Sequence, residues 1–427
     1  MKKTYQITEY GSFITGRKVD GYVTLPESTF FALENFVLTN RSKETDALEL
    51  MGLSARKGIG KVITAKNYVG VVSMKDGTTI EILPKIYSLV ETSPEKTKKL
   101  LVEMLKTLKN SPYKNLQTTS VNVDKMSIFE IFIRMFLDEV FYIAKRGLKC
   151  SYETIQSNED FFKGKILFSQ QIIHNYAHKE RCYVEYDEFN INRVENRLLK
   201  ATLQYLYRKT NSSKNKTDIK TLLNSFTDVD ASINYEQDFA KIVADRNTMD
   251  YTTALRWCKV FLTGKSFTSF AGSEVAIALL FPMEVLFESY IATMLRKVVD
   301  SSVYSVSTQD KSYYLFDAPN KKFLIKPDIV IKDKHNKEII IMDTKWKVLS
   351  DYKVNWGISQ SDMYQMYAYQ KKYEAKSVTL LYPLTELVKT DNIQFISDDG
   401  VLVKVKFLDL FNIKESLKQM LDEVVAV

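Results

Sequence analysis

The chain has 427 residues, of which 45% are hydrophobic and 12% aromatic, and its formal net charge is +8 at pH 7. This composition excludes wholesale disorder and allows two or three domains, while the moderately basic charge is compatible with a nucleic-acid partner. The three widely spaced cysteines, Cys150, Cys182 and Cys258, exclude a disulfide framework and a cysteine zinc site, which favours a reducing cytoplasm.

Residues 1–92 are predicted to form a β-rich domain. The first residues carry no apolar segment of the signal-peptide kind, and no run of eighteen apolar residues follows, so we expect a cytoplasmic protein with no membrane partner. Val69–Met74 and Thr78–Leu83 flank a Lys-Asp-Gly turn and predict a β-hairpin. The basic, glycine-containing segment Ala55–Lys61 is interpreted as a surface turn, because it lacks the spacing of a phosphate-binding loop.

Residues 93–268 are predicted to be mainly helical. Apolar periodicity and capping residues predict helices from Pro94 to Leu108, over Ile128–Lys145 and over Asn196–Tyr207. The polar residues 211–216 are predicted to form a loop.

Two patterns in this region resemble ligand sites but fail on spacing or composition. Gly264-Lys265-Ser266 ends like a Walker A loop, but Lys259 stands where the first glycine is required, so we expect no nucleotide-binding site. His174 and His178 are spaced i, i+4, but Asn175 replaces the glutamate of zinc proteases, which favours exposed surface histidines over a zinc site.

Residues 269–427 change to an α/β pattern. The predicted elements are helices over Pro282–Val299 and Ser361–Lys372, strands over Val303–Ser307 and Ser377–Tyr382, and a central hairpin over Phe323–Lys347. In chain order they predict a mixed sheet flanked by helices.

The central hairpin contains three charged side chains that an apolar strand does not require: Asp328, Asp343 and Lys345. Asp343 and Lys345 are two residues apart, so in a strand both point to the same face. A turn centred between residues 335 and 336 would place Asp328 opposite Asp343. We therefore expect two carboxylates and one ammonium group on one patch of the sheet.

Two carboxylates close together suit Mg²⁺, which binds carboxylate oxygens and keeps water molecules for a substrate phosphate. Asp328 and Asp343 are the predicted ligands. Lys345 can then orient or help to deprotonate an attacking water, or stabilise negative charge on the phosphate. The alternative interpretation of the same residues is a hairpin with a structural salt bridge.

These residues resemble the signature of the PD-(D/E)xK nuclease superfamily. Pro327-Asp328 and Asp343-Thr344-Lys345 match its central motif, and Gln365-Met366-Tyr367-Ala368-Tyr369 resembles the helix of its RecB-like branch. Gln365 and Tyr369 lie one helical turn apart, so both can contact a DNA phosphate or the catalytic lysine.

Further segments, in the same order along the chain, resemble the McrC family, which supplies the nuclease subunit of McrBC-type modification-dependent restriction systems and to which LlaJI-type subunits are related. These segments are Thr79–Ile86, Lys145–Leu148, Asn196–Leu199, Phe281–Glu288 and Asp362–Tyr369. The resemblance covers roughly residues 60–385.

The resemblance implies an α+β multidomain protein. Its parts would be a β-rich partner-docking domain over residues 1–92, a mainly helical middle region over 93–268 and a restriction-endonuclease-like α/β nuclease domain over 269–427.

The resemblance also assigns roles to individual residues. Asp328 and Asp343 fall on the metal ligands and Lys345 on the catalytic lysine, and no residue falls on a nucleotide cofactor site. The accessory residues are Gln365, Tyr369 and Glu288, with Glu284 as the alternative to Glu288 because the two lie one helical turn apart.

The implied function is a Mg²⁺-dependent endodeoxyribonuclease that cuts double-stranded DNA carrying a modified base of the 5-methylcytosine type. Its partner would be an AAA+ GTPase hexamer of McrB type, which recognises and translocates the DNA while the chain stimulates GTP hydrolysis. Two alternatives remain open: a GTPase-activating, DNA-binding subunit that does not cut, and a free-standing RecB-like repair nuclease.

Overall fold

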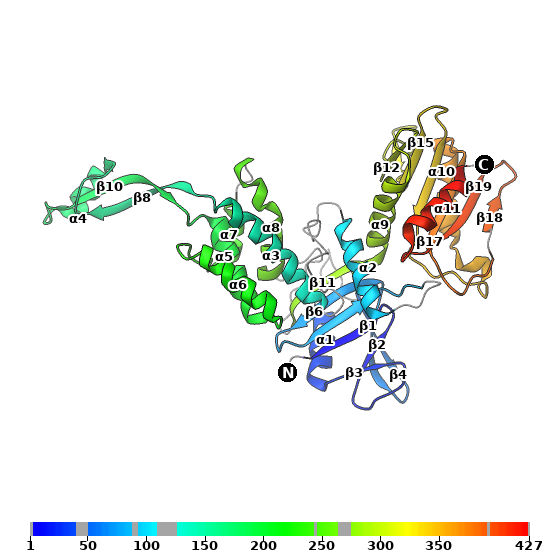
Figure 1. The fold of residues 1–427 in the computed structure, drawn as a ribbon, viewed down its shortest axis with the longest axis horizontal. Coiled ribbons are helices and arrows are strands. Elements are labelled where there is room, and N and C mark those ends of the chain that lie inside the picture. Colours follow the sequence, from blue (N-terminus) through cyan, green and yellow to red (C-terminus); the bar gives the residue numbers. More distant parts are fainter. Residues whose placement is uncertain are drawn as a thin grey trace. The chain divides into compact units, whose positions relative to one another are not determined.

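The computed structural model describes residues 3–39, 50–87, 93–108, 126–242, 246–263, 275–390 and 393–425. The chain divides into two compact units, residues 1–129 with 266–427, and residues 130–265. The predicted segments 1–92 and 269–427 therefore fall in one unit, and the predicted domain boundaries stay predictions. Figure 1 labels the helices and strands. None of the described helices is long and apolar enough to cross a membrane.

The N-terminal part of the first unit contains two four-stranded sheets, with strand orders β1-β7-β6-β11 and β3-β2-β5-β4. Helix α1 (Glu27–Thr39) shares an apolar core with both sheets. The strands are β1 (Thr4–Thr8), β2 (Ser12–Thr15), β3 (Val23–Leu25), β4 (Met51–Arg56), β5 (Gly60–Ala65), β6 (Tyr68–Met74), β7 (Thr79–Leu83) and β11 (Val275–Pro282).

Both turn predictions in this part are confirmed. Strands β6 and β7 form the predicted antiparallel hairpin, and Gly77 in its turn has a φ of 88°. The segment Ala55–Lys61 is the turn between β4 and β5, where Gly58 and Gly60 adopt positive φ values that glycine tolerates without strain.

Residues 275–282, which the predicted boundaries include in the C-terminal domain, form β11, a strand that was not predicted and that pairs antiparallel with β6. The two backbones approach so closely that a Cβ atom on Gly70 would lie 2.0 Å from the carbonyl oxygen of Leu279. The pairing joins residues far apart in sequence, so local patterns could not predict it.

A buried carboxylate on β7 contacts two other parts of the first unit, namely helix α2 (Pro94–Lys106) and Ile128, the residue at which α3 (Ile128–Arg146) begins. Glu81 is 0% exposed, and its Oε2 lies 2.8 Å from Nζ of Lys98 on α2. Its Oε1 accepts a hydrogen bond of 2.6 Å from the backbone N–H of Ile128, the first residue of α3. Glu81 thereby compensates one of the unpaired N–H groups at the start of that helix.

The second unit is mainly helical, and the predicted helices over 128–145 and 196–207 are confirmed as α3 and α5. One prediction is wrong: residues 211–216 are not a loop, because Ser212 caps a helix that begins at Ser213 and accepts a hydrogen bond from the N–H of Asn215 at 3.3 Å. The helices after α3 are α4 (Phe168–Asn175), α5 (Val194–Lys209), α6 (Ser213–Ser225), α7 (Tyr235–Ala240), the 3₁₀ helix Arg246–Tyr251 and α8 (Thr252–Thr263).

The second unit also contains an extended β arm that the sequence did not predict. Strands β8 (Ser151–Glu159) and β10 (Cys182–Asn190) pair over their full length, and the short β9 (Lys165–Ile166) adds to β10. Figure 1 shows α4 at the end of this arm. Its end exposes large apolar side chains, namely Phe161, Phe162, Phe168, Ile172, Ile173 and Tyr176.

The C-terminal part of the first unit is built on a six-stranded mixed sheet with the order β12-β15-β16-β17-β19-β18. Its strands are β12 (Tyr304–Thr308), β15 (Ile329–Asp333), β16 (Ile339–Thr344), β17 (Ser377–Pro383), β18 (Ile393–Ile396) and β19 (Leu402–Leu408). Strands β13 (Tyr314–Phe316) and β14 (Lys322–Leu324) form a separate hairpin before β15.

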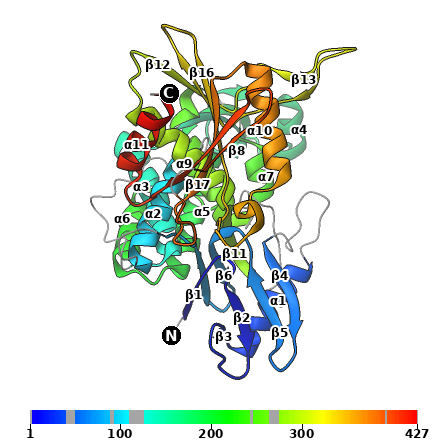
Figure 2. The ribbon, with the colours of Figure 1, turned by 90° about the vertical axis from the view of Figure 1, so that its right-hand side faces the viewer.

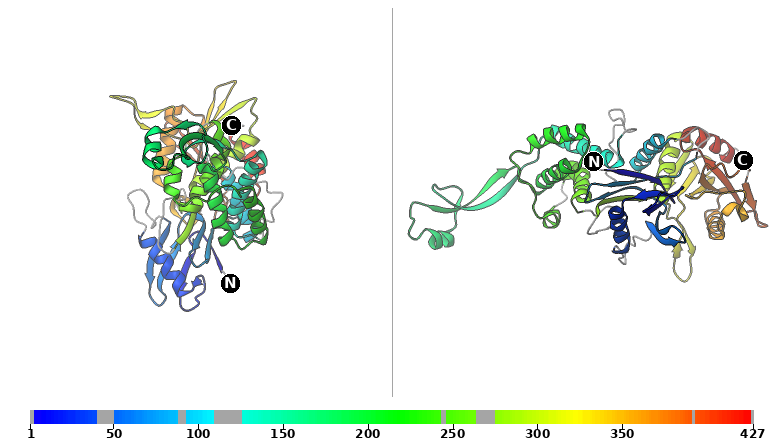
Figure 3. Two further views of the ribbon diagram at one scale, coloured as in Figure 1. Left: turned by 90° about the vertical axis from the view of Figure 1, so that its left-hand side faces the viewer. Right: turned by 90° about the horizontal axis from the view of Figure 1, so that it is seen from below.

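Helices cover both faces of this sheet, as predicted. Helix α10 (Gln360–Tyr373) packs through Met366, Tyr369 and Tyr373 into a core with Val378 and other strand residues. Helices α9 (Met283–Val298) and α11 (Ile413–Val425) pack against each other and on the sheet. Figures 2 and 3 show α10 and α11 on opposite faces.

Candidate functional site

The register of the central hairpin is the predicted one. Strand β15 pairs antiparallel with β16, with Ile329 opposite Met342 and Lys332 opposite Ile339. Asp328 immediately precedes β15, so continuing this register by one residue places it opposite Asp343.

Asp343 and Lys345 form the centre of the cluster. Asp343 is 2% exposed, and its Oδ2 lies 2.6 Å from Nζ of Lys345 in a contact that lacks the angles of a hydrogen bond. Burial, and then the charge of Asp328, raise the pKa of Asp343 to about 7 against the opposing effect of Lys345. The buried carboxylate is therefore only partly compensated by the chain itself.

Lys345 keeps its positive charge. Burial lowers the pKa of its ammonium group, but the carboxylates of Asp343, Asp362 and Asp328 outweigh burial and raise it. Asp362 Oδ1 lies 3.7 Å from Nζ. At neutral pH this lysine is a fixed cation that can stabilise an anion, and it is a poor general base.

Helix α10 positions two of the predicted accessory residues against this lysine. Ser359 caps the helix by accepting a hydrogen bond from the N–H of Asp362 at 3.1 Å. Lys345 Nζ donates to Oε1 of Gln365 at 3.1 Å, and Nε2 of Gln365 donates to the hydroxyl of Tyr369 at 2.7 Å. Because Gln365 and Tyr369 are spaced i, i+4, they lie on one face of the helix, where Tyr369 orients Gln365 and Gln365 binds the lysine.

Asp328 is held at the end of the neighbouring strand. Its Oδ2 accepts hydrogen bonds from the backbone N–H of Thr344 at 2.9 Å and from the Thr344 hydroxyl at 2.7 Å. Its Oδ1 lies 3.4 Å from Nε2 of Gln309, which also donates to Glu288. Asp328 is therefore oriented by backbone and side-chain donors, as a ligand carboxylate requires.

The structure separates the two glutamates of α9. Glu288 is half-buried and joined to Asp328 through Gln309. Glu284 is exposed and accepts a hydrogen bond of 2.5 Å from Nδ2 of Asn67. Glu288 belongs to the cluster, and Glu284 lies outside it.

Three residues of the cluster had no role assigned from sequence: Gln309, Thr344 and Asp362. Thr344 and Asp362 lie inside the quoted motifs, so their neighbours were a usable signal. Gln309 lies outside every motif and adopts a φ of 53°, which a polar turn residue can tolerate. Only the fold brings it between Glu288 and Asp328.

Trp346, the residue after Lys345, is held by hydrogen bonds to Glu9. The indole Nε1 of Trp346 donates to both carboxylate oxygens of Glu9, at 2.9 and 3.1 Å, and Glu9 also accepts from the N–H of Lys85 at 2.7 Å. Burial raises the pKa of Glu9 to about 7. The Trp346 ring packs against Phe287 with centroids 5.3 Å apart. The backbone beside Lys345 is thereby held on two sides.

The donor set fits a hard divalent cation. Within the described ranges, no group of three or more His, Cys, Asp or Glu side chains is arranged to hold a metal. Asp328 and Asp343 supply two carboxylates, and Mg²⁺ commonly uses one or two carboxylates together with water and substrate phosphate. The incompletely bonded Oδ2 of Asp343 is consistent with this use.

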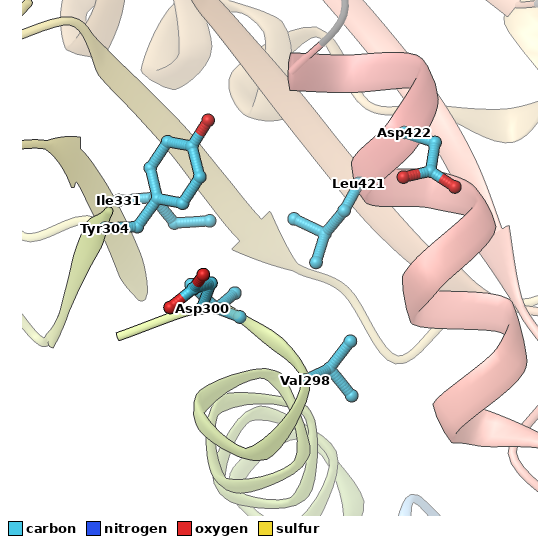
Figure 4. Close-up of a pocket in the computed structure, with 7 residues that line it drawn as sticks. Val298, Asp300, Tyr304, Ile331, Leu421 and Asp422 are labelled. Carbon is cyan, nitrogen blue, oxygen red and sulfur yellow. The ribbon is translucent and has the colours of Figure 1, made fainter. Parts of the chain in front are cut away.

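The histidine pair that was rejected as a zinc site from the sequence does not form a metal site in the structure. His174 lies on α4, His178 lies beyond its end, and both are exposed. Gly264-Lys265-Ser266 falls outside the described residues. A pocket near the end of α9 contains no predicted site residue (Figure 4); it is lined by Val298, Val299, Asp300, Tyr304, Ile331, Leu421 and Asp422.

Comparison with protein families identifies the chain. The model of the family described as "McrBC 5-methylcytosine restriction system component" matches residues 63–383, more than half of the sequence. The chain belongs to the McrBC family. The predicted site residues, from Glu288 to Tyr369, all lie within the matched segment. No curated protein matches.

One solved structure with bound McrC has the same fold as this chain. A chain from a refined half-complex of the tetradecameric assembly of Thermococcus gammatolerans McrB AAA+ hexamers with bound McrC aligns with a TM-score of 0.68 at 18% identity, covering 99% of this chain and 100% of that one. A chain of the cryo-EM structure of the Thermococcus gammatolerans McrBC complex aligns with a TM-score of 0.48 at 17% identity, covering 70% and 89%.

Proposed function

We propose that this chain is the DNA-cutting subunit of a modification-dependent restriction system, with a PD-(D/E)xK nuclease site at the end of β15 and β16. The observation that carries the proposal is the ion pair of the buried Asp343 with the half-buried Lys345 beside Asp328, with Gln365 accepting a hydrogen bond from the lysine. A structural salt bridge alone would not require a second carboxylate beside Asp343, because that neighbour raises the cost of its charge.

Each side chain then has a definite task. Asp328 and Asp343 would hold Mg²⁺, which supplies Lewis acidity and lowers the pKa of a bound water. Lys345, held as a cation by Asp343, Asp362 and Gln365, would stabilise the negative charge that develops on the scissile phosphate. Tyr369 fixes Gln365, and Gln309 with Glu288 fixes Asp328.

The proposed partner is an AAA+ GTPase of McrB type, and the substrate is double-stranded DNA with a 5-methylcytosine-type base. Support comes from the family and from the likeness to a chain in an assembly of AAA+ hexamers. The exposed apolar side chains at the end of the β8–β10 arm suit contact with another protein, and the family resemblance implies partner docking by residues 1–92.

The test is cleavage of methylated DNA by the chain assembled with its GTPase partner. Asp343→Ala and Lys345→Ala should each lower the cleavage rate by about a thousandfold or more, since they remove transition-state stabilisation, while GTPase stimulation and assembly stay at the wild-type level. Lys347→Ala is the matched control, because Lys347 lies two residues further on and is exposed.

Other outcomes identify the alternatives. Cleavage at the wild-type rate by Asp343→Ala would remove this site from consideration. A wild-type chain that stimulates GTP hydrolysis but never cuts with Mg²⁺ would be a non-cutting activator. Cutting without the GTPase would indicate a free-standing nuclease.

A further inference from the structure

The β13–β14 hairpin takes no part in the proposed reaction, yet it leads directly into the site. Tyr314 pairs with Leu324 and Phe316 with Lys322. Figure 2 shows the hairpin projecting beyond α10. Residues 325–327 alone separate it from Asp328.

The base of the hairpin is fixed to the helix that supports the catalytic lysine. The ring of Tyr313 packs on Tyr373 of α10 with centroids 4.5 Å apart. The Tyr373 hydroxyl donates to Oδ1 of Asp310 at 2.7 Å, and the N–H of Ile325 donates to the carbonyl oxygen of Tyr313 at 3.1 Å. The hairpin is thus held in a defined position relative to the site.

The free end of the hairpin exposes an aromatic pair. Phe316 is 55% exposed and Phe323 is 70% exposed, and their rings meet edge to face with centroids 5.9 Å apart. Phe323 has a φ of 58°, an unfavourable backbone conformation for a bulky residue, and such strain concentrates at functional positions. Two neighbouring exposed aromatic rings indicate a binding surface.

The charges around this pair select the partner. Lys311, Lys321, Lys322 and Lys326 are all exposed, and none of them has an ion-pair partner within the described part of the chain. The acidic residue of the hairpin, Asp317, is paired with Lys372 at 2.9 Å. Aromatic side chains among unpaired lysines fit nucleic acid, whose phosphates attract the ammonium groups while its bases accept the rings.

We propose that this hairpin inserts Phe316 and Phe323 into a groove of duplex DNA and unstacks one base step beside the scissile phosphate, while the lysines bind flanking phosphates. The inference rests on the proposed nuclease function. Five residues from Phe323 to Asp328 span at most about 18 Å, or about five base pairs at about 3.4 Å each. The unstacked step therefore lies within that distance of the cut.

The first experiment measures unstacking without cleavage. The Asp343→Asn chain, assembled with its partner, is mixed with methylated duplexes that carry 2-aminopurine at successive positions around the cut, and gels verify that the DNA stays intact. We expect the fluorescence to rise at one step, and the rise to disappear in Phe316→Ala/Phe323→Ala. Ile396→Ala, which removes a 71% exposed side chain on β18 at the opposite edge of the sheet, should keep it.

The second experiment measures the phosphate contacts. Lys321→Ala/Lys322→Ala should reduce the slope of log K against log salt by about two, since each phosphate contact contributes about 0.9. Lys414→Ala/Lys418→Ala on α11 is the matched control with an unchanged slope. Loss of the aromatic pair should weaken DNA binding by about tenfold, because each stacked base contributes substantially to affinity.

The outcomes separate this inference from the proposed function. No fluorescence rise at any position, or a rise that survives loss of both rings, overturns the inference. Loss of assembly with the partner in the Phe316→Ala/Phe323→Ala chain also overturns it, because the rings would then bind protein. A normal rise with a wild-type chain that does not cut leaves the hairpin inference standing and refutes the nuclease proposal.

Discussion

Two buried carboxylates, Glu81 on β7 and Asp343 on β16, occupy comparable positions but differ in how far neighbouring groups compensate their charge. Each lies on an inner strand of a sheet and is almost completely buried. Glu81 has Lys98 and the N–H of Ile128 on its two oxygens. Asp343 has one ion pair, with Lys345, and a second carboxylate nearby. Burial costs both residues hydration, but only Glu81 regains it fully within the chain.

We expect this difference to distinguish a structural charge from a functional one. A buried carboxylate whose partners all come from the chain stabilises the fold. One whose charge is only partly compensated by the chain, so that burial and a neighbouring carboxylate raise its pKa, is available to a ligand from outside. Amide substitutions that keep the shape of each side chain test this distinction.

The largest effect is expected for Glu81→Gln. The amide cannot form an ion pair with Lys98, and its NH2 group must face either the Lys98 ammonium or the N–H of Ile128, both of which are donors. The free energy of unfolding should therefore fall by about 3 kcal/mol. Urea unfolding at pH 8 measures it. Glu34→Gln is the control, since Glu34 pairs with the exposed Lys61 and such pairs contribute less than about 1 kcal/mol. Equal losses in the two variants would contradict the structural role of Glu81.

Asp343→Asn should stabilise the fold, in contrast to Glu81→Gln. In metal-free buffer at pH 8 we expect its free energy of unfolding to increase by about 1 kcal/mol. The folded pKa of about 7 exceeds the unfolded value, so the wild type loses stability as pH rises from about 4 to 7. The advantage of the variant should therefore grow over that range and stay constant above it. Glu9 titrates in both proteins and cancels in the difference. If the increase in the free energy of unfolding were largest at pH 4, the charge of Asp343 would be fully compensated in the wild type.

Addition of Mg²⁺ should give the smallest effect. Binding to the folded state alone should stabilise the wild type by about 1 kcal/mol when the ion is present at several times its Kd. Glu81→Gln should keep this increment and Asp343→Asn should lose it. Melting temperatures measured without Mg²⁺ and at Mg²⁺ concentrations raised in tenfold steps test this. A stabilisation by Mg²⁺ that persists in Asp343→Asn would place the ion elsewhere.

The sequence was sufficient to predict the centre of the site because its signals are local. Alternation in the hairpin and a short polar turn determined the register of Asp328 and Asp343, and helical spacing placed Gln365 and Tyr369 on one face. The roles of these residues stay predictions. The preference for Glu288 over Glu284 agrees with the geometry, but the reason, Gln309, was not visible in the sequence.

Other features lacked a local signal. Strands β8 and β10 contain one buried residue, Val184, because neither face packs on a core, so they show little alternation of apolar and polar residues, and the arm was missed. The helix at Ser213 was missed because its first turn is polar and resembles a loop. The pairing of β11 with β6 depends on contacts between distant parts of the chain.

The place of β11 in the N-terminal sheet also affects how the chain is made. During synthesis, β1, β6 and β7 leave the ribosome long before β11, and the whole of the second unit is translated in between. Until residue 282 has emerged, β6 keeps an open edge that can pair with another chain. The second unit thus behaves as an insertion between two parts of one sheet. Folding of the second unit shortens the loop that β11 must close, and a truncation before β11 would leave a sheet prone to aggregate.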